Sequence, residues 1–281
     1  MEKPDLVTYG AWRGVHPATG KKQGLAMMRL LAATTFLLCA ISGAAGETYR
    51  GDYTVSYLGL PIARSTFTST LTGDKFRVEG TLSSSGIGAI FDSTEGKVAA
   101  AGRFKDGAKV PDSFRMEYRS GGKAKRTAIR FTQGNVTATT NVPPLRQKNA
   151  KAWVLLGRDD LKAVVDPLSA TLVRAKTPHE VCRRTIKVFD GEIRVDLVLQ
   201  PAGSGGDSAS HKGAVTCSVQ FRPVAGYRKG KKALVYLQKK SEIVVSFAPV
   251  GSARVYAPVY ARVGTRLGPV TVHASGVEAV D

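Results

Sequence analysis

Residues 53–82 read YTVSYLGLPIARSTFTSTLTGDKFRVEGTL, and this stretch decides the fold class. Polar and apolar side chains alternate along it with a period of two, which is typical of β-strands that bury one face. The alternation is interrupted at residues 58–61 and 72–75, where Gly59 and Gly73 can adopt the positive φ of tight turns. The pattern therefore predicts three successive antiparallel strands.

The alternation continues through most of the chain. Turn residues separate further predicted strands at residues 93–104, 113–120, 127–132, 135–141, 215–222, 233–249, 253–263 and 269–274. The clearest hairpin is RTIKVFDGEIRVDLVLQ at residues 184–200, where Asp190 and Gly191 favour a two-residue type I′ turn. The sequence thus predicts an all-β protein built on a single large antiparallel sheet.

One stretch, residues 159–175, departs from the period of two. Its apolar side chains recur at the spacing of a helix, at Leu161, Val164, Val165, Leu168 and Leu172. Asp159 or Asp160 could cap a first short helix, and Asp166 before Pro167 matches the N-cap and first position of a second. We expect one short helical segment here that covers one end or face of the sheet.

The N-terminal part of the chain resembles a targeting signal. Residues 29–46 read RLLAATTFLLCAISGAAG, with the basic start, short apolar run and small final residues of a secretory signal peptide. The apolar run is too short for an ordinary membrane-spanning helix. We expect translation to start at Met27 or Met28 and cleavage to follow Ala45 or Gly46. The signal predicts export to the periplasm.

The exported part of the chain is expected to form one domain. Residues 1–46 are then an N-terminal extension and signal peptide that is removed, and residues 47–281 are a single β domain. The Gly, Ser and Asp run at residues 202–213 is typical of a flexible loop. We place no domain boundary there, because the strands on either side contain two cysteines that would be joined across it.

These two cysteines, Cys182 and Cys217, are the only ones left once Cys39 is lost with the signal peptide. In an oxidising compartment an even pair favours a disulfide. Two alternatives stay open at this point. A metal site would need two further ligands at suitable spacing, and a cysteine nucleophile would use His211, six residues before Cys217, as its base.

The chain is strongly basic, with 41 Lys and Arg against 22 Asp and Glu and a net charge of +19. Such a balance favours anionic partners. In the cytosol it would indicate nucleic acid first, but in the envelope the same charge meets lipopolysaccharide and anionic phospholipid head groups. We therefore predict an anionic lipid, lipopolysaccharide or an envelope protein as partner, and no nucleic acid. Only residues 228–232 are dense enough in charge to form a basic patch.

Four segments, taken in order, are similar to a known family. They are YTVSYLGLPIARSTFTSTL at 53–71, SSGIGAIF at 84–91, DPLSATL at 166–172 and C-x-x-x-x-KVFDG-x-x-x-x-DL at 182–197. Together they resemble the exported bacterial proteins of the domain of unknown function 3108 family over residues 49–225. The resemblance implies a periplasmic all-β protein with a strongly curved sheet, open or spiral and barrel-like, and no known activity. Arg64 departs from the family, because many members have Gly there.

The residue types that could carry chemistry have simpler explanations. Asp190 with Asp196, or Asp159 with Asp160, could supply the paired carboxylates of a glycosidase, but turn, strand and capping positions account for them. The serine hydrolase elbow G-x-S-x-G is absent from the sequence. The histidines stand apart from further metal ligands, at His179, His211 and His273. We predict no catalytic residue, no metal site and no cofactor.

These observations rank three functions. The first is a non-enzymatic envelope protein that binds a lipid, a lipoprotein segment or a peptide in a curved-sheet cleft and supports cell-envelope integrity. The second is a structural or assembly factor that contacts peptidoglycan or another envelope protein through strand edges. The third is a hydrolase, which would need a cleft of clustered titratable residues. The sequence leaves the ligand and the oligomeric state open.

Overall fold

The computed structural model describes residues 46–91, 93–146, 149–202 and 211–280. The expected start at Met27 or Met28, Cys39 and the signal peptide as far as Ala45 lie outside the described residues, so export and cleavage stay predictions. No helix in the described part of the chain is long and apolar enough to cross a membrane.

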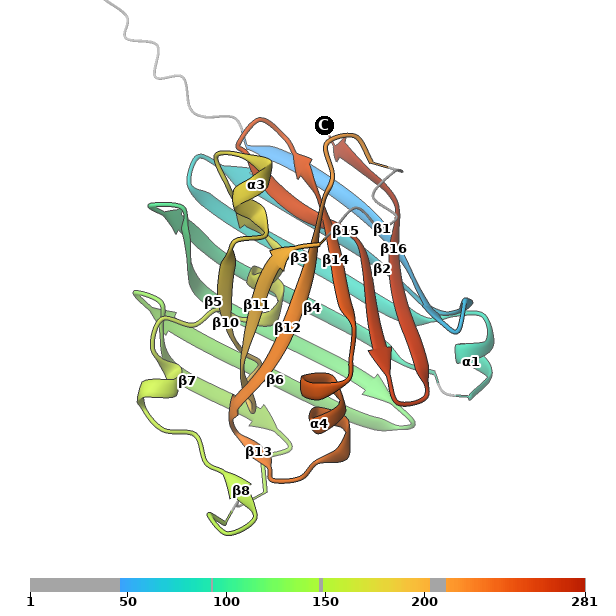
Figure 1. Ribbon diagram of the computed structural model, residues 1–281, viewed down its shortest axis with the longest axis vertical. Helices are drawn as coiled ribbons and strands as arrows, with labels where there is room; N and C mark the ends of the chain where they lie inside the picture. Colours follow the sequence, from blue (N-terminus) through green and yellow to red (C-terminus); the bar gives the residue numbers. More distant parts are fainter. Residues whose placement is uncertain (1–45, 92, 147–148, 203–210, 281) are drawn as a thin grey trace, which may run out of the picture. The chain divides into compact units, whose positions relative to one another are not determined.

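Fourteen strands form one large antiparallel sheet (Figure 1). Seven strands come from the first half of the chain: β1 Glu47–Tyr57, β2 Leu60–Thr72, β3 Lys75–Ser84, β4 Glu95–Lys105, β5 Ala108–Ser120, β6 Lys123–Thr132 and β7 Asn135–Val142. The others follow later: β9 Val173–Arg174, β10 Arg184–Phe189, β11 Arg194–Pro201, β12 Val215–Ala225, β14 Ile243–Val250, β15 Val255–Thr265 and β16 Gly268–Val280. Two further short strands pair with each other, β8 Trp153–Val154 and β13 Tyr227–Arg228.

The sheet is open, with β10 and β7 at the two ends of the strand order. The order runs β10-β11-β12-β14-β15-β16-β1-β2-β3-β4-β5-β6-β7, so β1 and β16, the two ends of the described chain, are neighbours in the middle of the sheet. Their register extends from Thr48 opposite Val280 to Tyr57 opposite Val270. The edges, β7 and β10, do not pair with each other. The predicted all-β fold with a single open, barrel-like sheet is confirmed.

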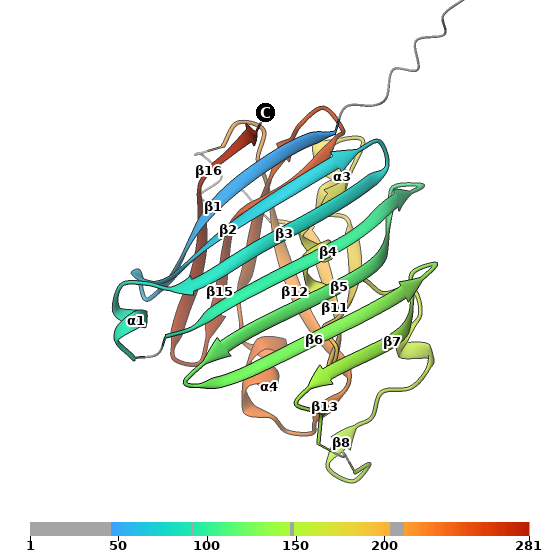
Figure 2. The ribbon, with the colours of Figure 1, turned by 180° about the vertical axis from the view of Figure 1, so that it is seen from behind.

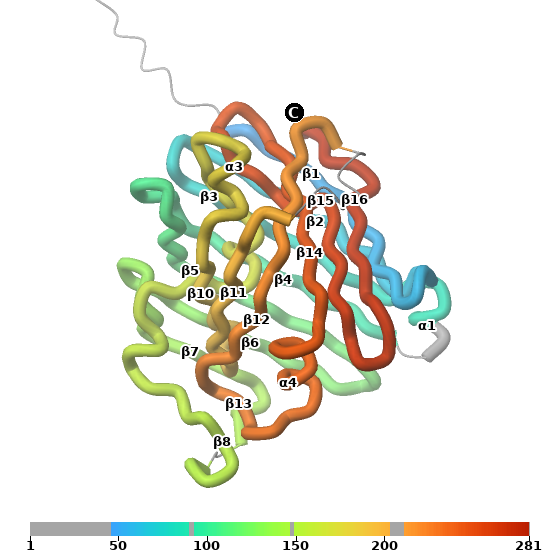
Figure 3. Tube along the Cα trace, in the orientation of Figure 1, coloured from blue at the N-terminus to red at the C-terminus, as the bar shows by residue number. Residues whose placement is uncertain are grey.

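The sheet is folded so that its two halves face each other. Figures 1 and 2 show β1 to β7 as one layer and β10 to β16 as the other, with their strands crossing. The tube in Figure 3 shows the same arrangement of the two layers along the Cα trace. Inward-facing side chains of both halves can therefore bury one another, as the alternating pattern requires.

The predicted helical segment lies between the two layers. It consists of the 3₁₀ turn η1, Asp159–Leu161, and the helix α2, Pro167–Thr171. Asp166 caps α2 as predicted, since its Oδ1 accepts hydrogen bonds from the backbone N–H groups of Leu168 (3.0 Å) and Ser169 (2.8 Å). The predicted cap of the first helix is wrong, because Arg158 stands at the N-cap of η1 and makes no side-chain cap.

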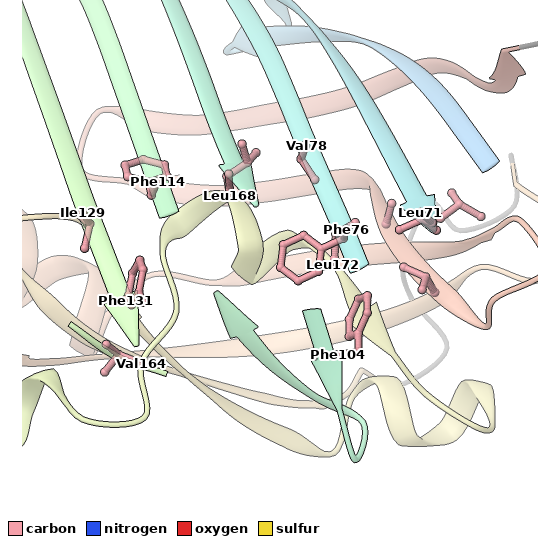
Figure 4. Packing of buried hydrophobic residues seen from close by; sticks show 14 of the residues in the cluster. Leu71, Phe76, Val78, Phe104, Phe114, Ile129, Phe131, Val164, Leu168 and Leu172 are labelled. Atoms are coloured by element: carbon pink, nitrogen blue, oxygen red, sulfur yellow. The ribbon is translucent and has the colours of Figure 1, made fainter. Parts of the chain in front are cut away.

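Residues of this segment bury side chains against both halves of the sheet. Leu168 and Leu172 belong to the larger core cluster with Phe76 and Phe104, and Figure 4 shows them among the aromatic side chains of the first layer. Val173 belongs instead to the second cluster, which also contains both cysteines of the predicted disulfide. The space between the layers is therefore filled largely by the protein's own chain.

The hairpin at residues 184–200 forms, but its predicted turn is wrong. Phe189 pairs with Arg194, so four residues rather than two connect the strands. Asp190 folds the loop by accepting hydrogen bonds at Oδ1 from the N–H groups of Glu192 (2.8 Å) and Ile193 (2.7 Å). A type I′ turn needs positive φ at both central residues, and only Gly191 has it, at 99°.

Three short helices were not expected from the alternation. A strand was predicted to start at residue 233, but Lys232–Lys239 forms the helix α4 and β14 starts only at Ile243. Apolar residues occur both in α4 and in β14, so the sequence pattern alone does not distinguish helix from strand. Burial of Leu234 favours the helix in the first of these segments. The helices α1, Ile87–Phe91, and α3, Pro178–Val181, are too short to show a helical period.

Candidate functional site

The structure joins Cys182 and Cys217 in the predicted disulfide, with 5.2 Å between their Cα atoms. Cys182 ends α3 and Cys217 lies within β12, and both side chains are buried. The bond ties the chain before the edge strand β10 to the third strand of the sheet. Because Cys217 is bonded, it offers His211 no thiol to activate, which excludes the cysteine nucleophile in this state.

The paired carboxylates do not come together as a catalytic pair. The Asp190 carboxylate accepts a hydrogen bond within its own turn, and the Asp196 carboxylate accepts one from Arg194 at 2.7 Å. Asp159 forms an exposed ion pair with Lys162 at 2.7 Å, and the Asp160 carboxylate accepts the N–H of Gly157 at 2.8 Å. Within the described ranges there is also no group of three or more His, Cys, Asp or Glu that could hold a metal ion.

Asp166, at the start of α2, is fully inaccessible to solvent, as are Ser169 and Ser246. Besides its two backbone hydrogen bonds, its Oδ2 accepts one from the Ser169 hydroxyl at 2.5 Å. Burial raises the pKa of Asp166 above its ordinary value, and the hydrogen bonds to Ser169 and Leu168 oppose that rise. All three of these hydrogen bonds come from residues of α2, so the Asp166 carboxylate serves this helix.

Lys109 secures the other end of α2. It reaches inward from β5 and donates a hydrogen bond from Nζ to the Ala170 carbonyl at 3.1 Å. Burial lowers the pKa of Lys109 to about 7, and the positive charge of Arg184 lowers it further, whereas Asp166 opposes the shift. The helix segment is thus held at its first turn by a carboxylate and at its last by an amine.

Replacing Lys109 by methionine should change how stability depends on pH. The folded pKa is about 7 and the ordinary value is 10.5, so the unfolded chain binds more protons between these pH values. The free energy of unfolding of the unmodified protein should therefore rise from pH 7 toward pH 10. Urea unfolding across this range should show that rise in the unmodified protein and in the exposed control Lys105→Met. Persistence of the same rise in Lys109→Met would contradict the assignment.

An apolar cavity of about 200 Å³ lies beside α2, between β1 to β3 of one layer and β15 and β16 of the other. No charged residue is among the twelve that line it. Phe67, Ala261 and Val272 in its wall are half-buried, so solvent reaches part of the lining. The wall includes Phe67, Val78, Leu168, Leu172, Ala261 and Val272.

Tyr53 lies in the cavity wall, and its hydroxyl group contacts the backbone. It donates a hydrogen bond to the Pro258 carbonyl at 2.9 Å, and its ring meets Phe67 edge to face with centroids 5.6 Å apart. Burial raises the pKa of Tyr53 to about 12, so the hydroxyl is neutral at physiological pH. The cavity therefore presents hydrocarbon and neutral hydroxyl groups only.

A larger depression of about 490 Å³ lies over the outer face of β3 to β6. Its walls carry exposed charges of both signs, among them Lys97, Arg119 and the ion pair between Glu117 and Arg126 at 2.9 Å. These side chains are exposed to solvent, where ion pairs contribute little. We therefore take the smaller apolar cavity as the candidate site.

Comparison with known proteins places the chain. A family model described as a protein of unknown function (DUF3108) matches residues 52–275. The chain belongs to this family. The DUF3108 match confirms the resemblance and extends it past residue 225, through the strands that complete the second layer. No curated protein was found to match the sequence.

Two solved structures are similar to this DUF3108 protein. One is a beta-barrel-like protein of domain of unknown function DUF1849 from Brucella abortus, which is 9% identical with a TM-score of 0.45, over 84% of this chain and 98% of that chain. The other is a hypothetical protein from Chlamydia trachomatis, which is 11% identical with a TM-score of 0.30, over 80% of this chain and 84% of that chain.

Proposed function

We propose that the protein is a non-enzymatic protein of the cell envelope that holds part of the aliphatic tail of a lipid in the cavity beside α2. The observation that carries the proposal is an apolar cavity with an uncharged wall inside an open sheet. Largely apolar cavities accept hydrocarbon ligands, because water molecules find few polar partners there.

The size of the cavity limits what it can hold. An apolar cavity of about 150 Å³ accepts a molecule as large as benzene, so about 200 Å³ accommodates a short stretch of an acyl chain. Each methylene removed from water contributes about 0.8 kcal/mol, so about five of them give the roughly 4 kcal/mol of millimolar binding. The remaining tail and the head group would lie outside the cavity, where the excess of Lys and Arg over Asp and Glu favours an anionic head group.

Filling the cavity tests this proposal. Ala261 lines it, and a phenylalanine there occupies much of the space, whereas Ala101 faces outward on β4 and provides the matched control. We expect Ala261→Phe to weaken binding of a fluorescent fatty-acid analogue by about tenfold or more and Ala101→Phe to leave it unchanged. Thermal unfolding of each variant verifies folding. Equal binding by both variants, or none by the unmodified protein, would contradict the proposal.

A second candidate function, assembly through a strand edge, rests on β7. The edge strand β10 is covered, since Val165 donates to the Lys187 carbonyl and accepts from the Phe189 N–H, each at 2.9 Å. Strand β7 ends the sheet with no further strand beside it in the described chain, and its sequence NVTATTNV carries no charge. Uncharged edges accept an added strand. A Thr139→Pro variant that loses a crosslinked envelope partner would support this function over lipid binding.

A further inference from the structure

A second apolar surface lies at the tips of two neighbouring hairpins. We call it the leucine rim and define it as Leu58, in the turn between β1 and β2, Leu60, the first residue of β2, and Leu267, in the turn between β15 and β16. Their exposed fractions are 57%, 54% and 79%. The hairpins touch, since the Leu58 N–H donates to the Pro269 carbonyl at 3.1 Å and the Tyr57 hydroxyl donates to the Leu267 carbonyl at 2.7 Å.

Folding alone does not account for a leucine at the first of these tips. Leu58 has a φ of 51°, in the left-handed region that favours Gly, Asn or Asp. Leu58 gains little burial in this turn to offset its backbone strain, because more than half of it remains exposed. An apolar contact outside the protein would give this side chain a role.

Exposed basic residues lie on the β15–β16 side of the rim. Arg266 is exposed beside Leu267. The end of α4 lies against the same hairpin, since the Ser241 hydroxyl donates to the Gly264 carbonyl at 2.7 Å, and this contact brings exposed Lys239 and Lys240 close. The acidic group here, Glu242, is paired with Arg262 at 3.6 Å.

We propose that the leucine rim inserts into the head-group region of an anionic phospholipid bilayer, with the neighbouring cations holding lipid phosphates. Exposed apolar tips flanked by Lys and Arg are the composition of surfaces that lie in a membrane interface. Charge complementarity selects the anionic bilayer over a neutral partner. The inference does not depend on occupancy of the cavity, although β1 and β16, which line the cavity, lead into the two hairpin tips of the rim.

Vesicle co-sedimentation tests the rim directly. The full mature chain should sediment with vesicles of phosphatidylethanolamine and phosphatidylglycerol and stay in solution with phosphatidylcholine vesicles. The double variant Leu58→Ser with Leu267→Ser should bind the anionic vesicles about tenfold or more weakly. Leu155→Ser is the matched control, since Leu155 is 46% exposed but lies next to β8, away from both hairpins (Figure 1).

The charge and cavity variants separate this inference from the proposed function. Lys239→Glu with Lys240→Glu should also reduce binding to anionic vesicles, and Ala261→Phe should leave it unchanged. Equal binding to both kinds of vesicle, unaltered binding by the leucine variant, or loss of binding in Ala261→Phe would each overturn the proposal. If the unmodified protein binds vesicles but no fatty acid, the proposed lipid binding in the cavity is wrong and the inference about the leucine rim is retained.

Discussion

Replacing Cys182 and Cys217 together by alanine should lower the free energy of unfolding by about 3 to 4 kcal/mol. The two residues are 35 positions apart, so the bond removes a large loop-closure entropy from the unfolded chain. Both sulfur atoms are buried in the second core cluster, which adds lost packing to the entropic effect. Alanine is chosen because serine would leave buried hydroxyl groups without partners.

Urea unfolding of the oxidised protein, the reduced protein and the double variant measures this effect. The double variant should match the reduced protein within about 1 kcal/mol, because both lack the same crosslink. The transition should remain cooperative, since the clusters that flank α2 keep their other side chains. A double variant as stable as the oxidised protein would contradict a stabilising role for the bond.

Replacing Asp166 by alanine should have the second large effect, a loss of about 3 kcal/mol or more. The substitution removes the N-cap of α2 and leaves the N–H groups of Leu168 and Ser169 and the Ser169 hydroxyl buried without their acceptor. Because Leu168 and Leu172 depend on the position of α2, the larger core cluster should loosen as well. Chemical unfolding and near-ultraviolet circular dichroism measure the two consequences.

Asparagine at position 166 is the informative control. It retains an oxygen for the backbone N–H groups but carries no charge, so it should cost less than half as much as alanine. Burial raises the folded pKa of Asp166 above its ordinary value of 3.8, so the folded state binds more protons just above that pH. This group therefore makes stability fall as pH rises through the unfolded pKa toward the folded one. Asp166→Asn should lack this fall, and a variant that keeps it would contradict the assignment.

Local sequence signals predicted the elements that depend on few residues. The period of two located most strands, Asp166 before Pro167 located α2, and the even cysteine pair indicated the disulfide. The predicted two-residue turn failed because Asp190 stabilises a longer loop through its side chain. The strand predicted from residue 233 failed because KALVYLQK also suits a short helix that buries Leu234.

The candidate site depends on contacts between distant parts of the chain, and local patterns carry no such information. Tyr53 and Pro258 are 205 positions apart, yet the pairing of β1 with β16 brings them together at the cavity. The period of two gives no indication that space remains beside Phe67. The leucine rim was also hidden, because Leu58 and Leu267 become neighbours only after the two hairpins pair.

Native mass spectrometry of the mature protein, purified from a bacterial periplasm, tests whether the cavity beside α2 holds a lipid. We expect a population of the unmodified protein to carry one lipid-sized adduct. The adduct should be present in Ala101→Phe and absent or strongly reduced in Ala261→Phe. It would be contradicted by unmodified protein that remains free of any adduct even after incubation with a phospholipid extract, or by an adduct that Ala261→Phe retains in full.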